Sequence, residues 1–151
     1  VYAANDAIAA EWFAPAGLNR GGIIGAVSVL NRLTHSERDT LYENKVNPIA
    51  AFPGQGIVAF GQKTLQDKAS ALDRINVRRL LLYTQRLVED VSLTLLFEQN
   101  DEEVRRQFES QVNPILANIR DERGIFDFRI ELDKARSRVR EKRFFIAIYL
   151  L

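Results

Sequence analysis

The sequence predicts an α/β fold in which two long antiparallel helices pack on one face of a mixed sheet. Three observations support this. Apolar residues recur at helical spacing through residues 75–97 and again through residues 102–123, and the period then changes to two between Phe126 and Leu132. Strict alternation of that kind is typical of a half-buried strand. At 151 residues the chain is long enough for one domain with its own core.

Short elements are predicted in the first part of the chain. The Ala-rich stretch Ala3–Phe13 predicts one or two helical turns, which Pro15 and Gly17 end. The uncharged run Ile23–Leu30 is expected to be buried, and its periodicity does not distinguish a helix from a strand.

Two further elements precede the long helices. Thr34 and Glu37 have the spacing of a capping box, which predicts a short helix over Ser36–Glu43. Ile57–Phe60 lies between glycines and predicts a short buried strand of the main sheet.

The long helices are expected at Ile75–Phe97 and Glu102–Arg123. The turn between them, Gln99–Asp101, is so short that they must run antiparallel. Pro114 lies inside the second helical pattern and predicts a kink or a split near Val112–Asn113, and Gly124 is a natural stop just past its end.

Two strands are expected after these helices. Phe126–Leu132 alternates apolar and charged residues, and a charged connector, Lys134–Lys142, follows. Phe144–Leu151 is apolar on both faces, and we expect it to complete the sheet. A terminal strand presents an open edge, and no charge or Pro blunts this one.

Composition excludes several classes of function. The formal net charge is +1, charged residues make up 27% of the chain and the mean hydropathy is −0.17, which favours neither a nucleic-acid nor a membrane protein. There is no Cys and one His, so thiol catalysis, iron–sulfur clusters and the usual zinc sites are excluded. The chain also has no Met, which indicates a processed product or a piece of something longer.

Three candidate chemical sites have a simpler structural explanation. The segment Gly56–Thr64 resembles a phosphate-binding loop, but Gln62 separates the second Gly from Lys63 and the residues between the glycines are strand-like. The acidic residues around the second helix start, with Asn100 or Asp101 as the cap, suit a helix N-terminus better than a metal site. These acidic residues are Glu98, Asp101, Glu102 and Glu103. His35 lies beside a helix cap and is expected to be solvated rather than catalytic.

The region from Arg129 to Arg143 is strongly basic, with seven cationic against three acidic residues and a local charge of +4. A solvated hairpin and a surface that faces an acidic protein partner both remain open. A nucleic-acid-associated module is the alternative function, although no aromatic residue lies between Phe128 and Phe144 to stack on bases.

The chain resembles contractile phage tail sheath proteins, above all those of T4-like phages. The resemblance rests on nine short sequence motifs, which occur in the same order and at the same spacing over residues 12–132. The first five cover residues 13–17, 19–21, 37–42, 46–49 and 52–58, and the remaining four cover residues 75–80, 97–101, 111–114 and 124–129. The resemblance implies a structural subunit without enzymatic activity or cofactor. Such subunits polymerise helically around a tail tube and contract to drive that tube through the host envelope for genome ejection.

The resemblance also implies an organisation and a set of partners. The chain is expected to be the conserved core of a longer subunit, with residues 1 to about 70 ending the preceding region and about 71–151 forming the C-terminal sheath domain. Expected partners are other copies, whose arms extend the sheet, the tail tube protein, and the baseplate and tail terminator proteins. Neither specific nucleic-acid binding nor membrane insertion is expected, and the location is the virion, or the host cytoplasm during assembly. The residues expected at interfaces are Arg129, Arg136, Arg138, Arg140, Lys142, Arg143, Phe144, Ile146, Ile148 and Leu150.

Overall fold

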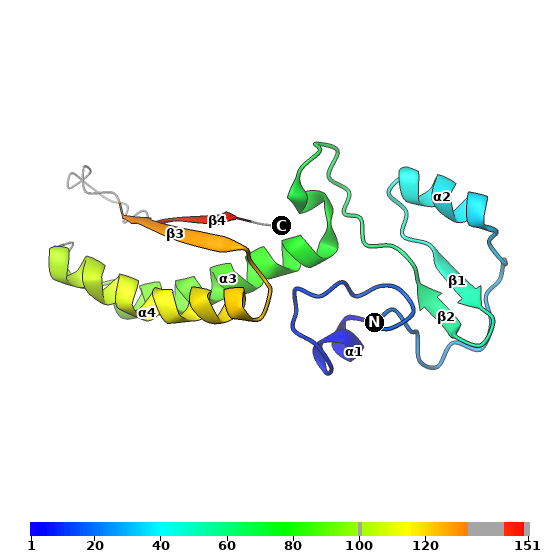
Figure 1. Ribbon diagram of the computed structural model, residues 1–151, viewed down its shortest axis with the longest axis horizontal. Coiled ribbons are helices and arrows are strands. Elements are labelled where there is room, and N and C mark those ends of the chain that lie inside the picture. The colour runs from blue at the N-terminus through cyan, green and yellow to red at the C-terminus, as the bar shows by residue number, and fades with distance from the viewer. Residues whose placement is uncertain (100, 133–143, 150–151) are drawn as a thin grey trace. The chain divides into compact units, whose positions relative to one another are not determined.

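The computed structural model describes residues 1–99, 101–132 and 144–149. The chain divides into two compact units, residues 1–81 and 82–151, and the long helix α3 (Ile75–Thr94) belongs to both. The first unit also holds α1 (Tyr2–Asp6), α2 (His35–Glu43), β1 (Ile49–Phe52), β2 (Gly56–Ala59) and a 3₁₀ turn at Ala71–Asp73 (Figure 1). The second holds α4 (Glu102–Asp121), β3 (Asp127–Leu132) and β4 (Phe144–Tyr149).

The first unit is built around the β1–β2 hairpin. The two strands pair antiparallel from Ile49 opposite Ala59 to Phe52 opposite Gly56, and Ala50 and Val58 are buried. An isolated antiparallel bridge joins Gly22 to Val58, so the chain near Gly22 lies along the second edge of β2. The strand expected at residues 57–60 is present, one residue earlier than predicted.

The prediction that this strand belongs to one sheet with the later strands is wrong. β2 pairs with β1, and β3 pairs with β4, in two separate two-stranded sheets. The sequence analysis missed β1 because Asn47-Pro48 and Phe52-Pro53 indicate loops at both ends of a run of only four residues. Without β1, the nearest strand partner for β2 was not visible.

The expectation that Ile23–Leu30 is buried is also wrong. Ile24, Val27 and Leu30 are 92%, 97% and 99% exposed. The chain pairs with β2 as far as Ile23, whose N–H donates to the Ile57 carbonyl at 2.9 Å, and then turns away at Ile24–Gly25. Apolar composition predicts burial only where another element covers the segment, and no described element covers this one.

The capping box at the start of α2 is confirmed. The Glu37 N–H donates to the Thr34 hydroxyl oxygen at 3.4 Å, and the Thr34 N–H donates to the Glu37 carboxylate at 2.7 Å. These bonds satisfy two backbone donors at the helix start and hold the pKa of Glu37 below its usual range. α2 nevertheless contains no buried residue, so its position depends on side-chain contacts at its edge.

The second unit matches the prediction of two long antiparallel helices packed on one face of a sheet. α4 runs back along α3, and the β3–β4 sheet lies against this pair (Figure 1). The core residues of α4 fall at helical spacing and are at most 8% exposed. They are Val104, Phe108, Val112, Leu116 and Ile119. Five of the six residues of the predicted apolar stripe are therefore buried, and Ile115 lies at its margin.

Both ends of α4 show how short-range sequence signals position it. The Asp101 side chain accepts a hydrogen bond from the Val104 N–H at 2.9 Å, as expected for an N-cap. At the other end Arg123, with φ of 63°, adopts the left-handed conformation predicted for Gly124. The Gly124 N–H donates to the Ile119 carbonyl at 2.7 Å and the Arg123 N–H to Arg120 at 2.9 Å, which defines a Schellman motif shifted by one residue.

The split predicted near Val112–Asn113 is absent, because α4 continues through Pro114. The residue whose carbonyl loses its N–H partner is Ser110, and it lies one turn earlier on the same exposed face. Water can therefore satisfy the freed carbonyl, so the helix continues.

β3 shows the predicted period of two, with Phe128, Ile130 and Leu132 half-buried and their neighbours exposed. It pairs antiparallel with β4 along six residues, from Asp127 opposite Tyr149 to Leu132 opposite Phe144. Phe126 is 68% exposed and precedes the strand rather than beginning it. Among the described helices, none has the length and apolar character needed to span a membrane.

Candidate interaction surface

The β3–β4 sheet is the part of the predicted interface that the structure describes. It consists of two strands in the described residues, so each strand has one edge without a partner strand there. In the register Phe144 lies opposite Leu132, Ile146 opposite Ile130 and Ile148 opposite Phe128. The three predicted apolar positions of β4 thus pair with the half-buried positions of β3. Leu150 lies outside the described residues.

Arg129 is the one residue of the predicted basic surface that can be located. It lies in β3 opposite Ala147, and its side chain is 71% exposed. Its Nε lies 3.3 Å from a carboxylate oxygen of Glu131, two residues along the strand. The other predicted basic residues, Arg136, Arg138, Arg140, Lys142 and Arg143, lie outside the described residues.

The candidate chemical sites take the structural roles expected for them. Gly56–Ala59 is strand β2, as the strand-like residues between the glycines predicted. Asp101 caps α4, and Glu102 pairs with Arg106 one turn later at 2.9 Å. No cluster of three or more His, Cys, Asp or Glu side chains suited to a metal ion occurs among the described residues.

A cavity of about 430 Å³ in the first unit adjoins His35. His35 Nδ1 lies 2.8 Å from a carboxylate oxygen of Asp39, and the two side chains are 82% and 62% exposed. The remaining lining residues are Ala14, Ala16, Gly17, Arg38, Tyr42, Pro48, Phe60, Gly61 and Gln62. Among the described residues that line this cavity there is no Ser, Thr or Cys.

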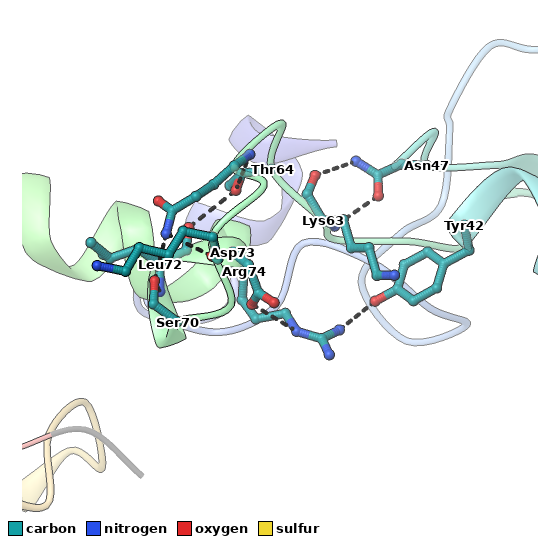
Figure 2. A network of polar contacts seen from close by, with 10 residues as sticks. Tyr42, Asn47, Lys63, Thr64, Ser70, Leu72, Asp73 and Arg74 are labelled. Carbon is teal, nitrogen blue, oxygen red and sulfur yellow. Dashed lines mark hydrogen bonds and ion pairs between the residues drawn. The ribbon is translucent and has the colours of Figure 1, made fainter. Parts of the chain in front are cut away.

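Sequence reasoning missed a network of polar contacts that organises the first unit (Figure 2). The Asn47 side chain donates to the Lys63 carbonyl at 2.9 Å and accepts from the Lys63 N–H at 2.8 Å. On its other side Lys63 forms an antiparallel bridge with Arg74, and the Thr64 N–H donates to the Asp73 carbonyl at 2.8 Å. The start of β1 is thereby connected to the start of α3.

Tyr42 extends this network to α2. The Lys63 ammonium lies 4.2 Å from the centre of the Tyr42 ring, and the Arg74 guanidinium donates to the Tyr42 hydroxyl (Figure 2). Lys45, which follows α2, forms an ion pair with Asp67 and lowers the pKa of that carboxyl. An Asn before a Pro and scattered cations are common in loops, so the sequence carried no specific signal for these contacts.

A second ion pair joins α1 to α3. The Arg79 Nη2 donates to both carboxylate oxygens of Asp6, at 2.8 and 2.6 Å, and the Arg79 guanidinium lies 5.0 Å from the centre of the Tyr2 ring. The hydrogen bond from Arg79 holds the pKa of Asp6 below its usual range. These polar contacts join segments of the first unit, in which the described buried apolar residues are few: Trp12, Ala50, Val58 and Leu80.

In the part of the chain that the structure describes, polar side chains join the loops and helices of the first unit, and β3 and β4 each have one edge without a partner strand. No family model matches the sequence. The tail sheath protein of Vibrio phage KVP40 is 43% identical over 129 residues, which is 85% of this chain and 19% of that protein. The tail sheath protein of Enterobacteria phage T4 is 33% identical over 131 residues, 87% of this chain and 20% of that protein.

A solved structure has the same fold. The sheath complex of an extracellular contractile injection system, PVC, in its contracted state superimposes with a TM-score of 0.83 over 99% of this chain and 44% of its own, at 19% identity. The chain is a homologue of phage tail sheath proteins and matches one segment of them. It spans about a fifth of the length of the curated relatives it matches.

Proposed function

We propose that this chain is the core of a tail sheath subunit that polymerises helically around the tail tube and contracts to drive the tube through the host envelope for genome ejection. The observation that carries the proposal is 43% identity to a phage tail sheath protein over 85% of the chain. The subunit would assemble in the host cytoplasm and act in the virion.

The open β3–β4 sheet supports a specific mode of self-association. A two-stranded sheet whose outer edges have no partner strand among the described residues can accept strands from other chains, and main-chain hydrogen bonds then hold the partner. We propose that extended arms of neighbouring subunits join this sheet. Such pairing can persist while subunits rotate, because it does not depend on particular side-chain contacts. A packed interface with two alternative arrangements is a suitable device for contraction.

The basic residues between Arg129 and Arg143 are proposed to face an acidic patch on the tube protein or on a neighbouring subunit. Charge complementarity of this kind contributes more to register and specificity than to raw affinity. The baseplate and tail terminator proteins are the proposed partners at the two ends of the sheath. Within the subunit, we propose that residues from about 71 onward belong to the C-terminal sheath domain and the preceding residues to the region before it.

Electron microscopy of the full-length subunit tests the proposal. The intact subunit is expected to form tubes, and a variant without its arms but with residues 1–151 unchanged is expected to remain folded and form none. Normal tubes from the armless variant would exclude strand exchange as the mode of assembly.

The charge reversals Arg136→Glu and Arg138→Glu are expected to weaken assembly at moderate salt, and unchanged assembly would argue against the basic interface.

A further inference from the structure

In the segment that follows the Gly22–Val58 bridge, every residue from Ile24 to Asn31 except the half-buried Val29 is exposed. Val27 and Leu30 are 97% and 99% exposed, and the whole stretch from Gly21 to Asn31 carries no charge. Between Val27 and Arg32 no backbone group forms a hydrogen bond within the part of the chain that the structure describes. Folded proteins rarely leave a contiguous apolar segment and its main chain uncovered in this way.

The composition of this segment is that of a strand. Ala26-Val27-Ser28-Val29-Leu30 contains two β-branched apolar residues and no Pro or Gly, and an uncharged run is typical of a strand covered on both faces. The preceding residues already behave as a strand, because Gly21–Ile23 exchange backbone hydrogen bonds with β2 at 2.8 and 2.9 Å. The chain leaves β2 at Gly25, where φ is 90°, and continues without a partner.

We propose that residues 26–31 form a strand in the complete sheath subunit, paired with an extended, uncharged, apolar segment from the part of the same subunit that lies outside this chain. One observation and one physical argument favour this partner. The curated relatives are about five times longer than the matched region, so most of the subunit is available to cover the segment. A covalently connected segment also has a high effective concentration before any assembly, unlike a second copy. The inference rests on family membership and does not require contraction.

Hydrogen exchange on the full-length subunit, before and after tube formation, tests the proposal. In residues 1–151 alone, the amides of Val27–Asn31 are expected to exchange without protection. In the unassembled full-length subunit they are expected to be protected by about 100-fold or more, as for a paired strand. Equal exchange in both proteins would overturn the proposal. Protection that appears only in tubes would also overturn it, because the partner would then be another copy.

A charge placed in the segment gives an independent measurement. Val27→Asp is expected to leave the melting temperature of residues 1–151 unchanged and to lower that of the unassembled full-length subunit by several degrees. Val27→Ile, which keeps an apolar β-branched side chain, should leave the melting temperature of the full-length subunit unchanged. Gln55→Asp adds the same charge at the exposed β1–β2 turn and serves as the matched control. If Val27→Asp and Gln55→Asp have equal effects in the full-length subunit, the proposal is wrong.

The outcomes also separate this inference from the proposed function. Normal tubes from a subunit whose residues 27–31 are unprotected would leave the sheath function intact and remove the inference. A protected segment in a subunit that forms no tubes would support this inference and contradict the proposed sheath function.

Discussion

Asn47 is hydrogen-bonded through its side-chain amide to both backbone groups of Lys63, sixteen residues further along the chain. The amide oxygen and nitrogen replace the N–H and C=O of a neighbouring strand, so a single side chain fixes the backbone position of residue 63. Because Lys63 is also bridged to Arg74, this contact sets where α3 begins relative to β1.

Asn47→Ala is expected to destabilise the first unit by about 1–3 kcal/mol, since the half-buried Lys63 backbone loses both partners. Asn19→Ala, at an exposed Asn of the same unit, is the control and should change stability by less than about 0.5 kcal/mol. Urea denaturation of both variants measures the difference. Equal midpoints would show that water replaces the Asn47 amide without cost.

Gly21 and Gly22 offer a matched pair for testing close backbone approach. A Cβ at Gly21 would lie 2.4 Å from the Ala59 carbonyl oxygen and 2.7 Å from backbone atoms of Gly17, whereas a Cβ at Gly22 meets nothing within 4 Å. Gly21→Ala is therefore expected to cost about 1–3 kcal/mol through backbone displacement. Gly22→Ala should be neutral or stabilise by up to about 1 kcal/mol through the unfolded state. Thermal unfolding of the two variants measures this difference in stability. Similar losses of stability in both variants would contradict the packing argument.

Arg123 occupies a left-handed position that favours glycine. Arg123→Gly is expected to raise stability by about 0.5–1 kcal/mol, because relief of the left-handed strain exceeds the added entropy of the unfolded chain. Gln107→Gly, at an exposed site inside α4, should instead lower stability by about 1 kcal/mol. Circular dichroism at 222 nm during denaturation follows both variants, and loss of stability in Arg123→Gly would show that the Arg side chain contributes more than the strain costs.

The Asp6–Arg79 pair makes stability depend on pH in the acid range. The hydrogen bond from Arg79 lowers the pKa of Asp6 in the folded state, so the pair's contribution is fully present above the unfolded carboxyl pKa of about 4. It is lost as the pH falls through the lower folded value. Asp6→Asn is expected to reduce the melting temperature at pH 7 and to flatten its decline below about pH 4.

The control for this prediction is Asp39→Asn, which removes a carboxylate from the exposed pair with His35. An exposed pair contributes little, so this variant should keep the acid-range slope of the parent. If Asp6→Asn and the parent lose stability in parallel below pH 4, Asp6 is not responsible for that slope.

Local sequence signals were sufficient to predict those elements that depend only on residues close together in the sequence. The capping box at Thr34 and Glu37, the Asp101 cap, the apolar stripe of α4 and the alternation of β3 all appear as expected. Each depends on residues within one or two turns of a helix or along one strand, so periodicity and spacing are enough to place it.

The sequence words that resembled tail sheath proteins identified the family, but most of the expected interface residues were not tested. Of these, only Arg129 has a described side chain, on an exposed face of β3. The polar network of the first unit was not anticipated, because Asn47, Lys63 and Tyr42 are far apart in sequence and individually unremarkable.

Pattern alone predicted the helical pair and the strand that follows it, because both depend on residue types and short spacings. Strand pairing and burial required the folded chain. β2 has β1 as its partner rather than β3, and the uncharged run around Val27 is bare rather than buried. Both depend on which distant segment is available to cover a surface, and hydrophobic periodicity describes only the surface to be covered.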